Sequence, residues 1–424
     1  MIRVVHVCAS DIIGGAARAS FRLHRSLVAN GVVESSMLVR GKASDDERVH
    51  RYIPGRWSLG YHYHFSVKRR LMDIFWASFR TPNRVMHSRA DIRTGLLAAL
   101  CDLPCDLVHL HWLGTNTLSI EEISQIGKPV VWTLHDMWTF CGAEHYTSDG
   151  PQARFRTGYR KGTRTAGEAG PDLNRHVWHR KQKAWTRPMT VICPSRWMAD
   201  CARESALLSN WPVHHLPNAL DLERWKPFPK AAARQFLNLP EDKRIILFGA
   251  ISGERDPRKG AELLRAALQS MKEFGADVHL VVFGQSKPEH PVPFAYPVTY
   301  LGRLQDEFSM ILAYNAADLL AVPSRQDNLP QTAVEAQACG IPVVAFDVGG
   351  LPDIVEHQRT GYLARPFDTV EMAGNIMQLL SDEENLLRMS QRARSIALEK
   401  FAAPVVAKAH VELYRQVLAE KPRA

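Results

Sequence analysis

Residues 319–346, which read LLAVPSRQDNLPQTAVEAQACGIPVVAF, decide the fold. The apolar run from Leu319 to Val322 predicts a buried strand, and a polar loop follows it. A helix comes next, because Pro330 suits a first helical turn and Gly340 suits the position after the last turn. A second apolar run, Pro342 to Phe346, predicts another buried strand. Such strand–loop–helix–strand units build parallel sheets covered by helices.

The same alternation runs through the chain twice. Apolar runs that predict strands occupy residues 4–8, 33–39, 107–110, 130–134, 190–193, 245–249, 278–283, 319–322 and 342–346. A proline-rich stretch without periodicity, 217–229, separates the halves, and 424 residues exceed what one core usually serves. We expect an α/β protein with two doubly wound, Rossmann-like domains, 1–216 and 217–399. An amphipathic helix within about 400–424 should pack back on the first domain.

The bulk composition predicts a cytoplasmic protein. The first residues enter a strand-like segment directly, without the features of a signal peptide, and no run of about 18 apolar residues occurs. Seven cysteines, an odd number scattered through apolar contexts, suit reduced thiols and complete no zinc site. Any membrane contact is therefore expected to be peripheral.

Positive charge is concentrated in one stretch. The formal net charge is +9, and residues 151–187 hold ten Lys or Arg against only Glu168 and Asp172. Nucleic acid, anionic lipid and phosphorylated substrates would all be attracted by it, although no nucleic-acid-reading module accompanies it, so no nucleic-acid partner is expected. Residues 147–175, rich in Gly, Arg and Thr, are expected to form a long basic loop.

Two carboxylates in the opening stretch are candidates for sugar recognition. Asp327 falls in the loop before the predicted helix, and Glu335 falls about one and a half turns inside it. A carboxylate accepts hydrogen bonds from adjacent hydroxyls, and a helix N-terminus offers amides to a phosphate. The alternative is that Asp327 assists capping and Glu335 is an exposed helix residue.

The extended segment resembles the acidic-x7-Glu signature of glycosyltransferase family 4. The resemblance implies that Asp327 approaches hydroxyls of the donated sugar, that Glu335 approaches the nucleotide ribose, and that the intervening residues Asn328, Leu329, Pro330 and Gln331 contribute to donor binding. Most relatives have Glu as the first acid. The Asp-Asn-Leu-Pro version resembles a branch of colanic-acid-type exopolysaccharide transferases.

A second segment resembles the phosphate-gripping strand–loop–helix of that family. It comprises residues 245–250 and the Arg255–Gly260 loop. The family usually has an Arg just after the strand glycine, where this chain has Ala250. Lys259 keeps the expected Lys-Gly position, and Arg255 or Arg258 would supply the missing cation. The alternative is a solvated basic loop.

A small-residue loop follows the first predicted strand. Gly14, Gly15 and Ala16 precede a predicted helix and would let a ligand approach the backbone, although ordinary turns use such pairs constantly. The three-glycine dinucleotide fingerprint is absent, which counts against NAD or FAD. In the resembled family this loop faces the donor diphosphate or the acceptor.

His135 opens a His-Asp-Met-Trp segment after a predicted strand and is similar to the His-Asp-x-Trp segment of this branch. Parallel strands end at the ligand cleft, so His135 is expected to contact the transferred sugar or to position the acceptor. His109 and His111 mark another strand end. For these two, packed histidines beside Trp112 are at least as good an interpretation as a functional role.

Residues 57–80 combine aromatic and basic side chains. We expect this segment and residues 154–187 to adsorb to an anionic inner leaflet. An ordinary buried helix face formed by residues 71, 74, 75 and 78 is the alternative. The candidate acceptor or membrane contacts are Trp57, Lys68, Arg69, Arg70, Trp76, Arg156, Arg160 and Lys161.

The resemblance implies a retaining, metal-independent hexosyltransferase of GT-B architecture, and no Asp-x-Asp motif is present. Its implied catalytic residues are His135, Lys259, Asp327 and Glu335. The donor would be a GDP- or UDP-linked sugar, with no cofactor, and the acceptor a polyprenyl-diphosphate-linked exopolysaccharide or O-antigen-type glycan. The alternative is an inactive protein that binds a nucleotide sugar or a lipid phosphate, which the departures at Ala250 and Asp327 favour.

Overall fold

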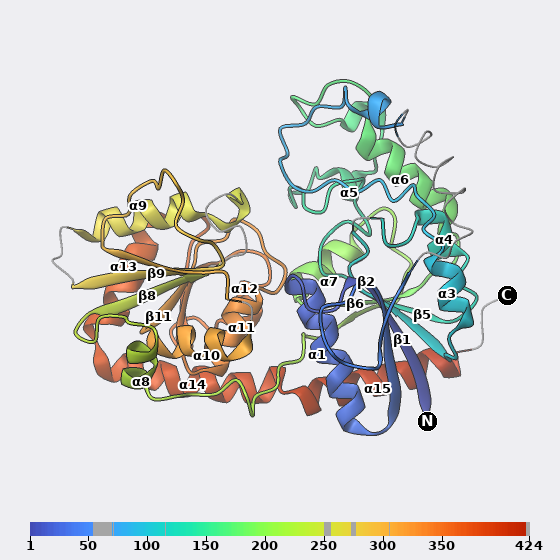
Figure 1. The fold of residues 1–424 in the computed structure, drawn as a ribbon. Helices are drawn as coiled ribbons and strands as arrows, with labels where there is room; N and C mark the ends of the chain where they lie inside the picture. The colour runs from blue at the N-terminus through green and yellow to red at the C-terminus, as the bar shows by residue number, and fades with distance from the viewer. Residues whose placement is uncertain are drawn as a thin grey trace. The chain divides into compact units, whose positions relative to one another are not determined.

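The computed structural model describes residues 1–53, 70, 72–114, 116–249, 256–272, 277–304 and 306–420. The chain divides into two compact units (Figure 1). Unit 1 comprises residues 1–216 and 407–424, and unit 2 comprises residues 217–406. Residues 400–406, which we expected to return to the first domain, therefore belong to unit 2.

Unit 1 is built on a seven-stranded sheet in the order β3-β2-β1-β4-β5-β6-β7, and every pair of neighbours is parallel. Its elements are β1 (Ile2–Ser10), α1 (Gly15–Asn30), β2 (Val33–Gly41), β3 (Val49–Arg51), α3 (Leu96–Asp102), β4 (Leu107–Leu110), α4 (Ile120–Ser124), β5 (Val130–Thr133), α5 (Arg154–Thr157), η1 (Lys161–Thr163), α6 (Leu173–Ala184), β6 (Thr190–Cys193), α7 (Arg196–Arg203) and β7 (Val213–His215). The helix α15 (Ala403–Ala419) begins in unit 2 and ends in unit 1.

The two faces of the unit 1 sheet differ in chemistry because successive residues of a strand point to opposite sides. Val5 and Val7 of β1 belong to a large apolar core. His6, between them, points to the other face, where it lies against His24 of α1 and His109 of β4. This second face therefore carries buried polar rings.

Unit 2 repeats the topology with a six-stranded parallel sheet, β10-β9-β8-β11-β12-β13. Its elements are α8 (Lys230–Phe236), β8 (Arg244–Gly249), η3 (Pro257–Lys259), α9 (Ala261–Met271), β9 (Val278–Phe283), β10 (Val298–Gly302), α10 (Glu307–Ala316), β11 (Leu319–Val322), α11 (Gln331–Ala338), β12 (Val343–Phe346), α12 (Leu351–Ile354), β13 (Gly361–Ala364), α13 (Thr369–Ser381) and α14 (Glu383–Phe401). In Figure 1, α9 and α13 cover one face of this sheet, and α8, α10 and α14 cover the other.

The predicted α/β class with two Rossmann-like, doubly wound sheets is confirmed. In both sheets the strand order reverses beside the first strand, between β1 and β4 in unit 1 and between β8 and β11 in unit 2. Ligands of such sheets bind beyond the carboxyl ends of the strands at this reversal. The loops that follow these four strands are therefore the first place to look for a site.

The prediction of a long basic loop at residues 147–175 is wrong. This stretch contains α5, η1 and the start of α6, and Phe155 and Tyr159 are fully buried. Arg154 is also buried, and its guanidinium donates to Asp172 Oδ2 at 2.7 Å. The prediction places these cations in solvent, whereas carboxylates within the fold neutralise several of them.

The interpretation of residues 71–78 as a buried helix face is also wrong where the structure describes it. Ile74 and Phe75 are 71% and 55% exposed, whereas Trp76 packs partly against the core of unit 1. Leu71 lies outside the described residues. Among the described helices, none combines the length and the apolar character that crossing a bilayer requires.

Candidate active site

Two loops at the strand-order reversal of unit 2 are joined by an ion pair. Lys259, at the end of η3, places its Nζ 2.5 Å from Oδ2 of Asp327, in the loop after β11. The backbones are also tied, because Arg325 N donates to Arg258 O at 2.7 Å. Gly260 makes this approach possible: it has a φ of 65°, and a Cβ there would lie 1.9 Å from Pro323 O.

Asp327 is held from several sides and is only 7% exposed. Its Oδ1 accepts from Asn328 N at 3.1 Å. In the loop between β12 and α12, Gly350 N donates to the Asp327 carbonyl at 3.0 Å, and a Cβ on Gly349 would come within 2.1 Å of that oxygen. Sequence reasoning missed Gly349 and Gly350, although a Gly-Gly pair that begins three residues after a buried strand is a usable signal.

Glu335 lies in the middle of α11 and is 1% exposed, so the interpretation as an exposed helix residue is wrong. The hydroxyl of Tyr314, on α10, donates to Glu335 Oε2 at 2.8 Å. Burial, and to a smaller extent the charge of Glu335, raises the pKa of the Cys339 thiol. A carboxylate buried in this way needs partners, and Tyr314, which sequence reasoning missed, is one of them.

The other predicted donor-binding residues are placed as follows. Arg258 forms an ion pair with Asp256 at 2.7 Å, whereas Arg255 and Ala250 lie outside the described residues. Asn328, Leu329 and Pro330 are buried in the loop before α11, and Gln331 is the first residue of that helix. Pro330 occupies the cap position rather than the first turn, and Gly340 follows the helix with a φ of 74°.

In unit 1 the small-residue loop leads from β1 into α1. Gly14 has a φ of 103°, a conformation that favours glycine, and no side chain caps the helix. Gly15 is exposed, while Gly14 and Ala16 are partly so. The first turn of α1 therefore presents backbone to solvent at the strand-order reversal, where such sheets bind ligands.

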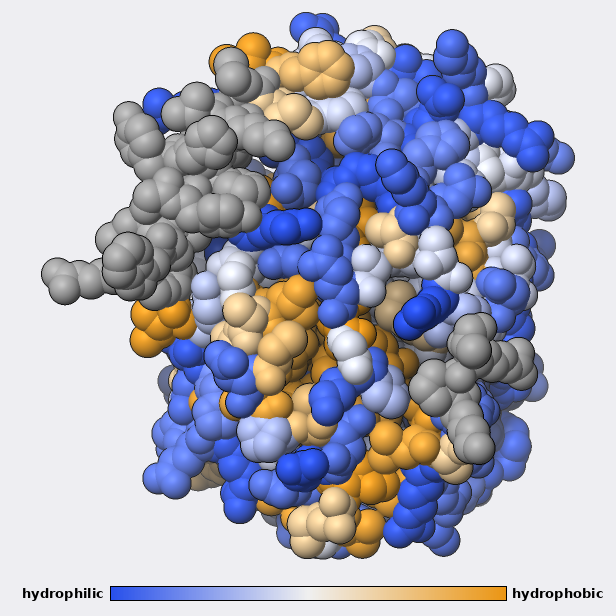
Figure 2. All heavy atoms as spheres, turned by 90° about the vertical axis from the view of Figure 1, so that its right-hand side faces the viewer, coloured by the Kyte–Doolittle hydropathy of each residue, from blue (hydrophilic) through white to orange (hydrophobic). Residues whose placement is uncertain are grey.

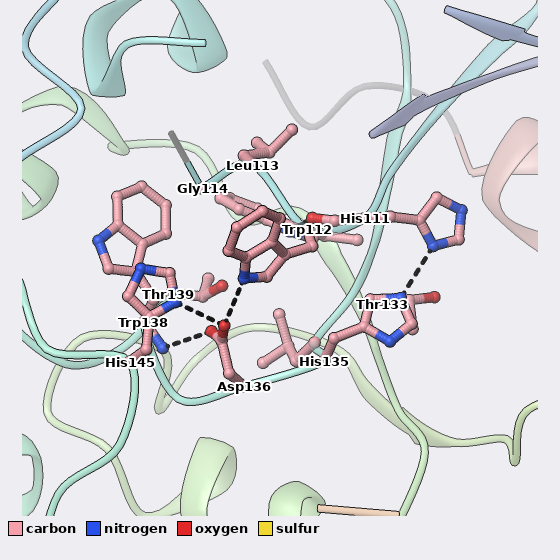
Figure 3. A pocket seen from close by; sticks show the side chains of 12 residues that line it. His111, Trp112, Leu113, Gly114, Thr133, His135, Asp136, Trp138, Thr139 and His145 are labelled. Carbon is pink, nitrogen blue, oxygen red and sulfur yellow. Dashed lines mark hydrogen bonds and ion pairs between the residues drawn. The ribbon is translucent and has the colours of Figure 1, made fainter. Parts of the chain in front are cut away.

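A small pocket lies beyond the carboxyl ends of β4 and β5 (Figure 3). It is lined by residues from the stretches 111–114 and 132–139, together with His145. The space open to the centre of a water molecule is about 10 Å³, which is room for about one water. His135 lines it and is half-buried, so the structure places this predicted residue at a strand end as expected.

Asp136 is the centre of a hydrogen-bond network in this pocket. Its Oδ2 accepts from Trp112 Nε1 at 2.8 Å and lies 2.6 Å from His145 Nδ1, and its Oδ1 accepts from Trp138 N at 3.0 Å. His145 Nε2 in turn lies 2.7 Å from Ser88 Oγ. These contacts lower the pKa of Asp136 against the opposing effect of burial.

This Asp–His–Ser order is that of a hydrolase triad. Ser88 is buried, however, and does not line the pocket, so the contacts fix the loop walls rather than expose a nucleophile. Sequence reasoning missed Trp112, Asp136 and His145 as a set, because they meet only after β4 and β5 pair.

Four histidines fill the polar face of the unit 1 sheet beside this pocket. His6 Nδ1 lies 2.9 Å from His111 Nε2, and His111 Nδ1 lies 3.2 Å from His135 Nε2. His109 instead places its Nδ1 2.6 Å from the hydroxyl oxygen of Tyr414, on α15, and its Nε2 2.7 Å from Thr133 Oγ1. These contacts agree with the interpretation of His109 as a packed histidine. Burial lowers the pKa of all four imidazoles, that of His135 to about 4, so they are neutral near pH 7.

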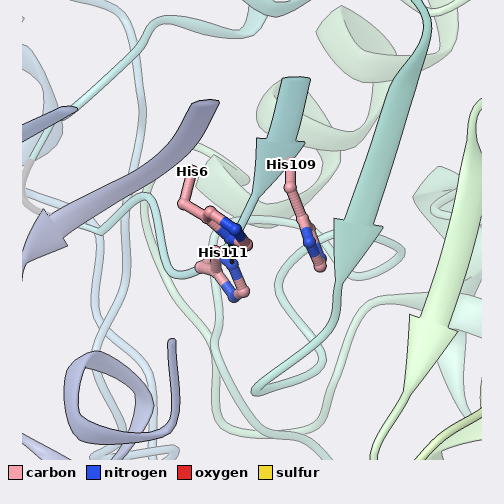
Figure 4. A group of neighbouring side chains, drawn as sticks. All are labelled: His6, His109 and His111. Carbon is pink, nitrogen blue, oxygen red and sulfur yellow. Dashed lines mark hydrogen bonds between the residues drawn. The ribbon is translucent and has the colours of Figure 1, made fainter. Parts of the chain in front are cut away.

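His6, His109 and His111 also form the group in the described part of the chain that comes nearest to a metal site, since one nitrogen of each lies within 4.8 Å of the others (Figure 4). The rings of His109 and His111 are stacked at 4.2 Å with 26° between their planes. Stacked rings direct their in-plane lone pairs along similar directions, whereas a tetrahedral ion needs them to converge. Both nitrogens of His109 are, moreover, already hydrogen-bonded.

The candidate surface contacts do not form one basic patch in the described residues. Arg70, Arg160 and Lys161 are exposed, but Arg156 is partly buried and forms an ion pair with Glu204. Trp57, Lys68 and Arg69 lie outside the described residues. The face drawn in Figure 2 is mostly hydrophilic, with hydrophobic residues gathered toward its middle.

The structure thus brings Lys259 and Asp327 together at the strand-order reversal of unit 2 and buries Glu335 in the helix that begins after the same loop. A cation beside a carboxylate can hold a phosphate and a sugar hydroxyl at neighbouring points. In unit 1, neutral imidazoles and backbone line the corresponding strand ends. Such groups bind uncharged hydroxyls without a large desolvation cost.

Comparison with known proteins identifies the family. Residues 13–224 match the model of "Glycosyltransferase Family 4", and residues 229–396 match that of "Glycosyl transferases group 1". The D-inositol 3-phosphate glycosyltransferase of Xylanimonas cellulosilytica is 31% identical over 339 residues, which cover 75% of this chain and 73% of that protein.

Solved structures share the fold. A sucrose-phosphate synthase from Thermosynechococcus elongatus superimposes with a TM-score of 0.65 at 20% identity, covering 99% of this chain and all of that one. Anabaena Alr3699/HepE in complex with UDP-glucose superimposes with a TM-score of 0.64 at 16% identity, covering 98% of this chain and all of that one. The two units thus have the GT-B architecture, and the family matches show that the chain belongs to glycosyltransferase family 4 and is a glycosyltransferase.

Proposed function

We propose that this glycosyltransferase moves a hexose from a nucleotide-diphosphate sugar, and that unit 2 binds the donor. The contact between Lys259 and Asp327 is the observation that carries the proposal. The ammonium would hold a diphosphate oxygen, and the carboxylate would accept hydrogen bonds from hydroxyls of the sugar. Buried Glu335, oriented by Tyr314, would accept from the nucleotide ribose. The Alr3699/HepE structure, with UDP-glucose bound, has the same fold and supports this kind of donor.

Transfer with retention and without a metal ion is part of the proposal. The acceptor hydroxyl would attack from the face that the diphosphate leaves, and a leaving-group oxygen would take the proton. Lys259 and the backbone amides that open α11 would stabilise the negative charge that develops on the diphosphate, in the way that fixed donors stabilise an oxyanion. His135 would contact the transferred sugar or the acceptor in unit 1.

We propose a polyprenyl-diphosphate-linked glycan of the exopolysaccharide or O-antigen type as acceptor, on the cytoplasmic face of the membrane. The exposed Arg160 and Lys161, and the exposed Ile74 and Phe75, offer the charged and apolar contacts that a peripheral protein needs. A phosphorylated cyclitol is the second candidate, because the Xylanimonas relative is an inositol 3-phosphate glycosyltransferase.

Donor titrations test the first part. The purified chain should bind one class of nucleotide sugar, read as a rise in melting temperature across a UDP- and GDP-sugar panel, with EDTA present throughout. Lys259→Ala should abolish the rise and Lys243→Ala should keep it. Lys243 pairs with Asp277 at the amino ends of β8 and β9, whereas the site lies beyond the carboxyl ends of the strands. A rise that survives Lys259→Ala would contradict the donor assignment.

Product analysis tests the acceptor and the stereochemistry. The chain, given its donor, would be incubated separately with a polyprenyl-diphosphate glycan and with inositol 3-phosphate. NMR of the purified product shows whether the anomeric configuration of the donor is kept. Transfer to inositol 3-phosphate alone would replace the lipid-linked acceptor, and hydrolysis of donor without transfer to either would leave the acceptor outside both classes.

A further inference from the structure

Three imidazoles of unit 1 form a continuous hydrogen-bonded row, which we call the histidine chain: His6 on β1, His111 after β4 and His135 after β5. The row begins in the buried polar face of the sheet, where His6 is fully buried, and ends at the half-buried His135 in the pocket of Figure 3. His111 uses both ring nitrogens in it, at 2.9 Å to His6 and 3.2 Å to His135.

Proton counting leaves two arrangements for such a row. A neutral imidazole carries one N–H and one bare nitrogen, and each contact in the row needs one of each. Either His6 Nδ1–H donates to His111 and His111 Nδ1–H donates to His135, or both hydrogen bonds run in the opposite direction. Burial lowers the pKa of each ring, which keeps the row neutral near pH 7.

The far nitrogen of His6 decides between the two. His6 Nε2 is buried and has no hydrogen-bond partner among the described residues. In the first arrangement this atom is a bare acceptor, and in the second it is an N–H donor without an acceptor. Among backbone groups, buried N–H donors without partners are rarer than carbonyl acceptors that go unused, and we apply the same ordering to imidazole. The first arrangement is therefore favoured, and it leaves His135 with its proton on Nδ1.

We propose that His6 and His111 are positioning residues that fix the tautomer of His135, so that His135 presents a neutral Nδ1–H to an oxygen acceptor of the substrate. That acceptor is a hydroxyl or phosphate oxygen. The role of His135 in transfer rests on the proposed function, whereas its tautomer is a property of the unliganded chain. His135 is then a hydrogen-bond donor and not a general base.

Nuclear magnetic resonance of the full chain labelled with 15N-histidine tests this directly. Multiple-bond 1H–15N correlations at pH 7.5 distinguish Nδ1–H from Nε2–H tautomers, and the missing signals of His135→Gln and His111→Gln assign the rings. We expect His135 to be protonated on Nδ1. A wild-type signal with the proton on Nε2 overturns the proposal, whatever the activity of any variant.

Two substitutions of His111 separate the row from simple packing. In His111→Phe the donor is lost, and His135 should change to the Nε2–H form that a free imidazole prefers. In His111→Gln the amide can donate to His135 and accept from His6, so Nδ1–H should persist. Loss of one substrate hydrogen bond predicts a fall in kcat/KM of about tenfold in His111→Phe, with rescue in His111→Gln. An unchanged His135 tautomer in a folded His111→Phe contradicts the proposal.

Metal analysis of the purified protein closes the main alternative. One equivalent of tightly bound metal that is lost on substitution of His6 would mean that these nitrogens are ligands and cannot form the row. The other failure combines two results: the parent protein carries the Nδ1–H tautomer, and His135→Gln keeps the wild-type kcat/KM. In that case the positioning of His135 stands, but His135 takes no part in transfer. The two failures are thus distinguishable.

Discussion

Replacing Lys259 by alanine should reduce transfer far more than it reduces stability. Lys259 Nζ lies 2.5 Å from Asp327 Oδ2, and the two side chains are 24% and 10% exposed. A hydrogen bond to a charged group contributes about 1.5–3 kcal/mol, and solvent screening of a partly exposed pair reduces this to about 1–2 kcal/mol. The melting temperature of a unit of this size should then fall by roughly 2–8 °C.

The catalytic effect is expected to be larger because the cation is needed most when the diphosphate leaves. Removing one fixed donor from a site of developing negative charge costs about 10²–10³ in kcat. The assay is kcat and KM for the nucleotide sugar at saturating acceptor, beside circular dichroism melts of the same samples. Lys243→Ala, which removes an ammonium paired with Asp277 at 2.7 Å, is the matched control.

A double-mutant cycle separates phosphate binding from support of Asp327. If Lys259 served only to neutralise Asp327, adding Asp327→Asn to Lys259→Ala would restore activity, because the uncompensated carboxylate is gone. We expect no restoration. A folded Lys259→Ala enzyme with kcat/KM within about threefold of wild type, which is about 0.6 kcal/mol, would refute the reasoning.

Three further outcomes are expected. Tyr314→Phe should raise the donor KM and lower the stability of unit 2 by about 2 kcal/mol, because buried Glu335 loses a hydroxyl donor at 2.8 Å while the ring packing is kept; kinetics and urea melts measure both. Lys181→Met should cost unit 1 about 3 kcal/mol in urea melts, since the fully buried Lys181 nitrogen, whose pKa burial lowers to about 7, no longer donates to the carbonyls of residues 138, 141 and 142. Stability should also fall on acidification: burial lowers the pKa of His24 to about 4, so between pH 6.5 and 4 the unfolded chain binds the proton that the fold excludes. Between pH 7 and 5 this imidazole should lower the free energy of unfolding by about 2 kcal/mol. A His24→Gln variant whose free energy of unfolding falls with pH as steeply as that of the wild type would contradict the assignment.

The sequence predicted the interior strands of both sheets and missed their edges. All nine predicted apolar runs are strands, whereas β3, β7, β10 and β13 were not predicted, and these four are the outermost strands of the two sheets. A central parallel strand is buried on both faces and therefore appears as a continuous apolar run. An edge strand is short and partly exposed, as in the stretch Val213–His215, so its sequence has no such run.

The same distinction applies to the site. Lys259, Asp327 and Glu335 could be singled out because the segments that contain them resemble those of glycosyltransferase family 4, and the predicted strand ends indicated where they would lie. Tyr314 and Gly349 could not, because they reach the site from other elements, 21 residues before Glu335 and 22 residues after Asp327. The ion pairs that neutralise the 151–187 stretch, such as Arg180 with the distant Glu121, were hidden for the same reason.

The two units share one topology but differ in the charge that they offer at the strand-order reversal. Unit 2 presents a cation and a carboxylate in contact, which suits a substrate that carries both phosphate and hydroxyl groups. Unit 1 presents imidazoles that burial keeps neutral, the last of them half-buried at His135. A neutral N–H can donate to an acceptor hydroxyl without a net charge that would attract the donor diphosphate to unit 1. If His135 were instead charged at neutral pH, raising the pH from 5 to 8 would weaken acceptor binding, whereas a neutral donor predicts an acceptor KM that is constant across this range.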